Sequence, residues 1–93
     1  FYYKSAQNYE VDFVIKNDLV VTGLIQVSYD IENAATKERE IRSLLHGAKE
    51  LGCNNLLIIT GDYEDEEEVE WFGMKGRIVF IPLWKWLLEG NGL

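Results

Sequence analysis

Cysteine, proline and histidine each occur only once in this 93-residue sequence. The single Cys53 excludes an internal disulfide, and no cluster of Cys and His is present that could hold zinc. Long apolar runs are also missing. Even the longest uninterrupted runs, such as residues 56–59, fall far short of the roughly 20 residues of a membrane-spanning helix. We therefore expect a soluble protein without membrane contacts, and the lone thiol suits a reducing, cytoplasmic setting.

The sequence also lacks a Gly-rich phosphate loop followed by Lys and Ser or Thr, so ATP hydrolysis cannot reside in these residues. The chain begins at Phe1, with neither an initiator methionine nor a basic-then-apolar leader. Because residues 1–3 already resemble the start of a strand, we expect a fragment of a larger protein. Its length and its 47% apolar content match one compact domain.

Basic residues are too few to balance the acids: 9 Lys and Arg stand against 16 Asp and Glu, giving a net charge of −7. Such a balance argues against extensive contact with nucleic-acid phosphates. The excess is local, since seven acids lie between Asp62 and Glu70 and the other nine equal the Lys and Arg in number. We expect this acidic segment to be a solvated loop or a hairpin edge that discourages strand aggregation and repels DNA.

Two strand-like segments lie in the first third of the chain. Apolar and polar residues alternate between residues 9 and 15, which predicts a strand with Glu10 and Asp12 on one face. The opposite face then carries the apolar residues Val11, Phe13 and Ile15. Residues 16–18 supply turn chemistry, and the β-branched segment 19–29 predicts a second strand, so the two form a hairpin.

A helix is predicted over residues 36–51, where apolar residues recur at helical spacing. Asn33 or Thr36 can cap its start, and Gly52 stands where a left-handed residue commonly ends a helix. The near-continuous apolar segment Asn55–Thr60 is typical of a strand covered on both faces. A strand, a helix and a further strand imply a right-handed crossover that makes the two strands parallel.

Residues 77–81 predict one more strand, and Pro82 at a first helical turn introduces a short helix that ends the chain. The predicted order is strand, strand, strand, helix, strand, acidic loop, strand and short helix. The fold class is therefore a mixed-sheet α/β domain with one main crossover helix and a short C-terminal helix.

A hairpin with acids on one face, followed by a crossover helix and a buried strand, is the layout of the PD-(D/E)XK nuclease core. Four blocks closely resemble the C-terminal domain of archaeal AAA-type ATPases: Glu10-Val11-Asp12-Phe13-Val14-Ile15, Leu24-Ile25-Gln26-Val27-Ser28-Tyr29, Thr36-Lys37-Glu38-Arg39-Glu40-Ile41 and Phe80-Ile81-Pro82-Leu83-Trp84-Lys85-Trp86-Leu87-Leu88. The resemblance covers nearly the whole chain. It implies that residues 1–93 are one restriction-endonuclease-like domain without the first helix of that core, following a P-loop ATPase and a winged-helix segment.

The resemblance also assigns roles to single residues. Asp12 matches the metal-binding Asp of the nuclease motif, and Glu10 matches the acid often found beside it. Gln26 stands where the second acid belongs, and Ser28 where the lysine belongs. A neutral amide removes one charge, which is worth about 4 kcal/mol for two charges ~4 Å apart at an effective dielectric near 20. We therefore interpret the site, including an Mg²⁺ or Mn²⁺ position between Asp12 and Gln26, as degenerate.

The strand register decides whether the motif can assemble. A tight two-residue turn at residues 17–18 would leave Asp12 three residues short of Gln26, about 10 Å along the strand at ~3.3 Å per residue. Ligands of one Mg²⁺ each lie about 2.1 Å from it, so that register could not build the site. We predict either a longer loop through Val20 or a bulge near Gly23.

Other side chains are candidates for binding. Arg39 and Arg42 on the predicted helix could reach a phosphate, although pairing with neighbouring glutamates is the commoner arrangement. Trp84 and Trp86 could stack on bases, but packing is the better interpretation, with one ring inward and one exposed. Together with Leu87 they form an apolar set that could dock on a partner.

The leading functional prediction is an accessory, catalytically degenerate domain of an archaeal ATP-binding protein, making interdomain, oligomer or nucleic-acid contacts. Its partners are then its own ATPase domain, a second copy or DNA, and ATP belongs only to the missing part. One alternative is an active Mg²⁺- or Mn²⁺-dependent DNA nuclease, and another is a purely structural dimerisation module.

Overall fold

The computed structural model describes residues 2–4 and 9–89 of the chain. Five strands form the main sheet in the order β3-β4-β5-β7-β6, and two short strands form a separate ladder, β1-β2. The strands are β1 (Tyr3–Lys4), β2 (Glu10–Val11), β3 (Phe13–Asn17), β4 (Val20–Val27), β5 (Leu56–Thr60), β6 (Asp65–Trp71) and β7 (Met74–Pro82). The helices are α1 (Ala34–Leu51) and α2 (Leu83–Leu88).

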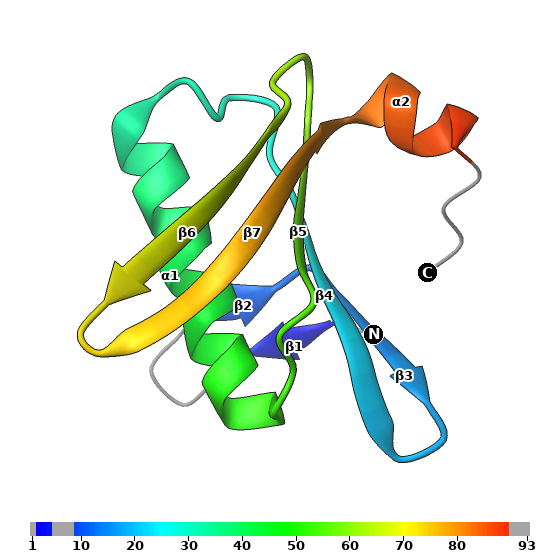
Figure 1. Cartoon of the computed structure of the whole chain (residues 1–93), viewed down its shortest axis with the longest axis vertical. Helices are drawn as coiled ribbons and strands as arrows, with labels where there is room; N and C mark the ends of the chain where they lie inside the picture. Colours follow the sequence, from blue (N-terminus) through cyan, green and yellow to red (C-terminus); the bar gives the residue numbers. More distant parts are fainter. Residues whose placement is uncertain (1, 5–8, 90–93) are drawn as a thin grey trace.

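The central strands β4, β5 and β7 run parallel, whereas β3 and β6 pair antiparallel at the two edges. The helix α1 connects β4 to β5 and lies behind the sheet in Figure 1, while α2 follows β7 at one end of the sheet. The predicted α/β class, with a mixed sheet, one main helix and a short C-terminal helix, is therefore confirmed. Among residues 2–4 and 9–89, no helix has the length and apolar content needed to cross a bilayer.

Local sequence explains where α1 begins and ends. The side-chain oxygen Oδ1 of Asn33 accepts a hydrogen bond from the Thr36 backbone N–H at 3.0 Å, so Asn33 is the N-cap. Gly52 ends the helix with a φ of 67°, a left-handed conformation that glycine adopts without strain. Gly47 faces the sheet: a Cβ there would lie 2.8 Å from Val11 Cγ2. Glycine at this position therefore lets α1 pack closely against β2.

The first predicted strand is interrupted. The strand β2 ends at Val11, and β3 starts at Phe13 after a bend at Asp12. The predicted alternation through residues 9–15 is therefore wrong, because Val11 and Val14 are both buried under α1 while Phe13 is 52% exposed. The bend shifts the side-chain alternation by one residue between the two halves.

The acidic segment is a strand, not a loop. The strand β6 pairs with β7 from Asp65 to Trp71, and the hairpin turn uses Phe72 and Gly73, both at positive φ. The hairpin-edge alternative is thus correct, and β7 begins at Met74, three residues before the predicted start. The sequence pattern explains the outcome, since alternate residues of β6 face α1 and are partly buried: Glu67, Val69 and Trp71.

Apolar clusters lie on the two opposite faces of the sheet. On the side covered by α1, which we call the α1 face, the buried strand residues are Val14, Leu24, Leu56, Ile58, Ile78 and Phe80. The opposite side, which we call the α1-free face, carries Phe13, Ile25, Val27, Leu57, Ile59, Val79 and Ile81. Only Ile25, Ile59 and Ile81 are buried there, and Leu83 and Trp86 from α2 pack against them.

Candidate functional site

A β-bulge brings the two halves of the nuclease-like motif together. The β3–β4 register runs from Phe13 opposite Ile25 to Ile15 opposite Gly23, and it then shifts by one residue. The bulge predicted near Gly23 is therefore confirmed. The register continues to a tight turn at residues 18–19, one position later than the predicted turn. As a result, Asp12 lies beside Gln26, and the two residues are hydrogen-bonded.

Gln26 acts as a clamp on the bend between β2 and β3. Its amide Nε2 donates to the Glu10 backbone carbonyl at 2.9 Å, and its Oε1 accepts from the Asp12 backbone N–H at 2.7 Å. The side chain is 2% exposed, so these two bonds satisfy buried groups on both sides. A primary amide carries the same donor and acceptor as a peptide group, and Gln26 therefore replaces the backbone pairing that the bend interrupts. Its oxygen already has a partner at the place where the motif needs a metal ligand.

Asp12 is tied to the backbone in the same way. One carboxylate oxygen, Oδ2, accepts from the Val27 backbone N–H at 3.0 Å. Ser28 is buried beyond it, and its backbone N–H donates to the Ile59 carbonyl at 2.9 Å. Glu10 points outward, where its carboxylate accepts from the Tyr2 hydroxyl and raises the pKa of that phenol. The fold thus brings the four motif residues near one another. Most of the polar side-chain groups of Glu10, Asp12 and Gln26 form hydrogen bonds within the protein.

Glu40 is the functional candidate that sequence reasoning missed. Burial raises the pKa of the Glu40 carboxyl, the charge of Asp12 raises it further, and the neighbouring Arg39 partly offsets both. The helix α1 therefore places a second acid near Asp12. A signal was present, because Glu40 precedes the buried residues Leu44 and Gly47 by four and seven positions and so lies on the same stripe of the helix.

These residues do not reproduce the metal centre of the nuclease motif. Asp12 and Glu40 are two carboxylates, the amide oxygen of Gln26 already accepts one backbone hydrogen bond, and Ser28 cannot supply the cation of a lysine. Among the residues that the structure describes, no group of three or more His, Cys, Asp or Glu is arranged to hold a metal ion. The motif positions thus supply one carboxylate and one amide oxygen, with the Glu40 carboxylate nearby.

The two candidate arginines lie in different places. Arg39 Nε is 3.5 Å from Glu40 Oε1, which connects it to the neighbourhood of Asp12. Arg42 has a terminal nitrogen 3.5 Å from Glu38, and its guanidinium lies 5.4 Å from the ring centre of Trp71. Both contacts belong to a groove between α1 and β6. The structure therefore pairs both arginines with glutamates of α1, Arg39 with Glu40 and Arg42 with Glu38.

The terminal helix α2 divides its apolar residues between two directions. Trp86 packs on the α1-free face against the isoleucine cluster, whereas Trp84 is 56% exposed and Leu87 is exposed as well. The prediction that one tryptophan packs inward and the other outward is confirmed. Within the described part of the chain, the buried Trp86 Nε1 has no hydrogen-bond acceptor.

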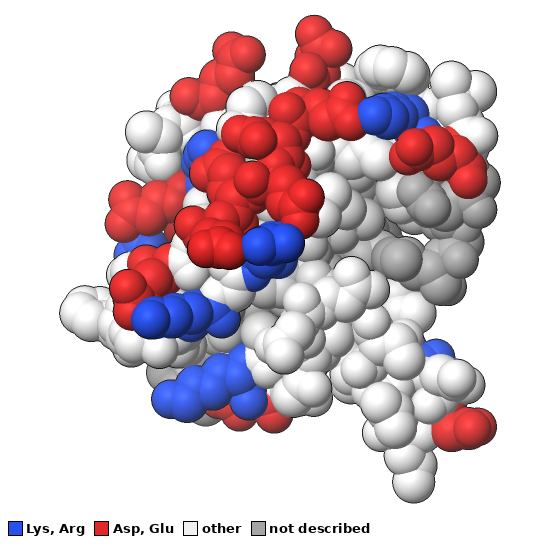
Figure 2. Space-filling view, in the orientation of Figure 1, with Lys and Arg blue, Asp and Glu red and all other residues white. Residues whose placement is uncertain are grey.

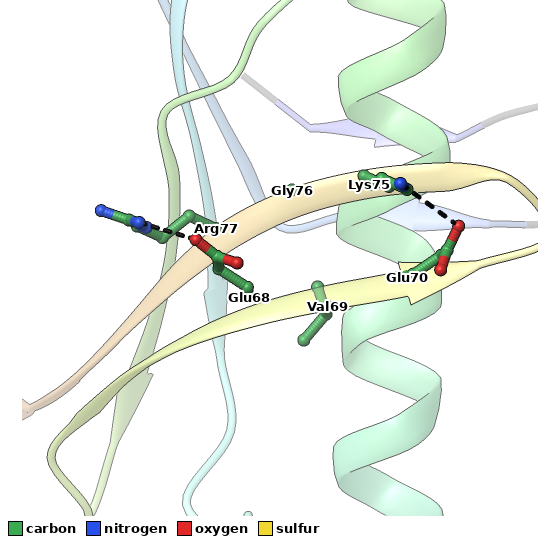
Figure 3. Close-up of a pocket in the computed structure, with 6 residues that line it drawn as sticks. All are labelled: Glu68, Val69, Glu70, Lys75, Gly76 and Arg77. Carbon is green, nitrogen blue, oxygen red and sulfur yellow. Dashed lines mark hydrogen bonds and ion pairs between the residues drawn. The ribbon is translucent and has the colours of Figure 1, made fainter.

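Charged residues gather on the β6–β7 hairpin, next to the apolar part of the α1-free face. Figure 2 shows the acids as a continuous red area beside a wide white area. A hollow of about 390 Å³ lies on this hairpin. Figure 3 shows residues that line it, where Glu68 pairs with Arg77 at 2.8 Å and Glu70 with Lys75 at 3.9 Å. The cations are therefore already paired, and the hollow offers no free positive charge to a phosphate from these two residues.

The chain is similar to Uncharacterized protein MJ1544 of Methanocaldococcus jannaschii, with 38% identity over 89 residues. The match covers 94% of this chain but 20% of the relative, so the chain spans about one fifth of the relative's length. No family model and no solved structure matches the chain.

Proposed function

We propose that this chain is an accessory domain with a degenerate nuclease-type site, and that it docks through its α1-free face onto another part of a larger archaeal ATP-binding protein. The observation that carries the proposal is the apolar composition of a sheet face that α2 covers only at one end. Exposed apolar surface of this extent commonly marks an interaction site. The greater length of the archaeal relative agrees with a domain that works inside a longer polypeptide.

The state of the motif supports an accessory role over catalysis. Gln26 is committed to two backbone bonds, and Asp12 holds the Val27 N–H. A metal ion at this place would draw on Gln26 Oε1 and the Asp12 carboxylate, whose hydrogen bonds to the backbone are each worth about 1 kcal/mol net. The site is therefore better suited to keeping the β2–β3 bend in place than to activating water.

Side-chain footprinting tests the docking role. Hydroxyl radicals should label Phe13 and Trp84 in the isolated 93-residue chain, because both are more than half exposed. Within the intact parent polypeptide the same two side chains should be protected. Phe72 at the tip of the β6–β7 hairpin is a matched control that should stay labelled in both forms. Equal labelling of Phe13, Trp84 and Phe72 in the parent would refute docking through this face.

A second candidate function is an Mg²⁺- or Mn²⁺-dependent nuclease. It is favoured by the proximity of two carboxylates, since the charge of Asp12 helps to raise the pKa of the Glu40 carboxyl. Two carboxylates in proximity are a minimal set for such an ion, with water and phosphate as the other ligands. Calorimetric titration with millimolar Mn²⁺ separates the candidates. Heat that disappears in both Asp12→Ala and Glu40→Ala supports the nuclease, whereas no heat in the unaltered chain supports the accessory role.

A further inference from the structure

The α1-free face contains a continuous apolar row that crosses four strands. The strand register places Phe13 opposite Ile25, Ile25 opposite Leu57, and Leu57 opposite Val79. Residues opposite one another in a sheet share a face, so these side chains form one row. The two ends of the row are open, with Phe13 52% and Val79 38% exposed. The next residue in the row, on β6, is the acid Glu66.

The helix α2 covers only one end of this face. Leu83 and Trp86 pack against the isoleucine cluster, which joins Ile25 of the row to Ile59 and Ile81 of the next row towards the ends of β5 and β7. Three other apolar residues of α2 remain exposed: Trp84, Leu87 and Leu88. The exposed apolar surface therefore includes the two ends of the row, Phe13 and Val79, the partly exposed Leu57 between them, and the outer side of α2.

The strand pattern indicates that a helix covers this face. The segment of β5 is apolar at consecutive positions, which is typical of a parallel strand buried on both faces. In the described residues α1 covers one face only, and Leu57 on the other face is partly exposed. A helix satisfies its own backbone hydrogen bonds, so it can bury an apolar face without needing a free strand edge.

The surrounding charge selects what kind of helix fits. Acids outnumber cations at this edge by five to three. The acids are Glu66, Glu68 and Glu70 on β6, with Asp62 and Glu64 before them, and the cations are Lys75 and Arg77 on β7 and Lys85 on α2, which pairs with Glu64. A second copy of this chain, which also carries −7, would bring like charges together. A partner with basic residues along one side of its apolar stripe would instead be attracted to this edge.

We infer that the row Phe13, Ile25, Leu57 and Val79, together with the outer side of α2, binds an amphipathic helix whose flank facing β6 is rich in Lys and Arg. This inference rests on the proposed docking function and adds the chemistry of the occupant. The apolar stripe of that helix lies on the row and contacts Trp84, while its cations approach Glu66, Glu68 and Glu70. Affinity comes chiefly from the apolar contact, and the charges set orientation and the rate of association.

Designed peptides test this assignment. The probes are an 18-residue helical peptide with Leu at i, i+3, i+4 and i+7 and Lys elsewhere, a twin with Glu in place of Lys, and a scrambled Leu/Lys peptide. The Leu/Lys helix should bind the 93-residue chain at least about tenfold more tightly than either of the other two. Amide NMR shifts should concentrate at Leu57 and Val79 and spare the outer surface of α1.

Matched variants separate the face from general acidity. Val79→Ser should weaken binding of the Leu/Lys helix about tenfold, whereas Leu19→Ser, at an exposed position in the β3–β4 turn, should not change it. Equal binding by the scrambled peptide would overturn the inference, since it would show attraction to acids alone. So would unchanged binding to the Val79→Ser variant.

The same experiments distinguish failure of the inference from failure of the proposed function. If the Glu twin binds as tightly as the Leu/Lys helix, while Phe13 and Trp84 are protected in the parent polypeptide, the docking face stands and the basic occupant is wrong. If no protection occurs in the parent, both the docking function and its occupant are refuted.

Discussion

The two faces of the sheet differ in how completely they use their side chains. On the α1 face even the polar residue Gln26 is 2% exposed and has partners for both ends of its amide. On the α1-free face, by contrast, apolar residues such as Val79 and Phe13 remain in water. Side chains alternate between the two faces along each strand, so adjacent residues of one strand belong to different environments.

This difference indicates that the α1 face contributes mainly to folding stability and that the α1-free face can contribute to binding. Side chains on the α1 face contribute their burial to folding, because α1 already covers them. Much of the corresponding contribution from the α1-free face is available only when a partner covers it. The same strands can therefore stabilise the fold on one side and offer binding energy on the other.

The largest predicted effect comes from two neighbouring leucines. Leu56 is 2% exposed on the α1 face, whereas Leu57 is partly exposed on the α1-free face. Leu56→Ala should lower the free energy of unfolding by about 3 kcal/mol, because a buried cavity forms where the side chain was. Leu57→Ala should cost about 1 kcal/mol, since part of its side chain is already in water. Urea denaturation followed by circular dichroism measures both.

The two variants are matched in chemistry, strand and strand propensity, so only the face differs. Equal losses in the isolated chain would contradict the comparison, because they would mean that both faces are equally buried. In a complex with the occupant, Leu57→Ala should additionally weaken binding, whereas Leu56→Ala should affect binding only through folding.

The next effect tests whether the polar clamp on the α1 face tolerates a charge. Gln26→Glu restores the acid of the nuclease motif, but an ionised carboxylate cannot donate to the Glu10 carbonyl as the amide does. We expect a loss of on the order of 2 kcal/mol near pH 7. A protonated carboxyl can reproduce both hydrogen bonds, so its pKa in the folded state should lie above the unfolded value of about 4.3. The loss should therefore be small below about pH 4 and grow as the pH rises.

Val20→Glu is the control for this experiment, because it adds the same charge on the same strand at a position that is largely exposed. It should change stability by no more than about 0.5 kcal/mol and without the same pH dependence. A Gln26→Glu variant that is as stable as the unaltered chain near pH 7 and that binds Mn²⁺ would revive the nuclease candidate.

The order of the elements could be predicted from the sequence because each rests on a local pattern. Helical spacing and caps identified α1, and the apolar run identified β5. The bend at Asp12 was not predicted, since residues 9–13 alternate through it and the pattern is broken only at Val14, which follows the bend. The strand β6 was not predicted because five of its seven residues are acids, and the partial burial of Glu67, Val69 and Trp71 depends on α1 lying above them.

The sequence predicted which residues of the candidate site meet, but not the hydrogen bonds that they form. The motif implied that Asp12 and Gln26 meet, and a bulge near Gly23 makes that register. Which groups each amide and carboxylate bonds depends on the bend, a tertiary feature without a sequence signal. The approach of Glu40 to Asp12 likewise depends on how α1 crosses the sheet.

The smallest predicted effect concerns Glu40, the second polar residue near the clamp. Burial, followed by the charge of Asp12, raises the pKa of the Glu40 carboxyl from its usual 4.5. The folded state thus holds this proton more strongly than the unfolded state, and stability is lost as the pH rises above about 4.5. Glu40→Gln cannot ionise, so its melting temperature should exceed that of the unaltered chain near pH 7. The gain should shrink towards pH 4 in thermal scans.

Glu38→Gln is the matched control, because Glu38 carries the same charge on the same helix but is exposed and paired with Arg42. It should shift stability by no more than about 0.5 kcal/mol. Equal gains in the two variants would trace the effect to the net charge of −7 rather than to Asp12. A gain confined to Glu40→Gln would show that the acid pair on the α1 face is retained at a cost in stability, as is common at functional sites.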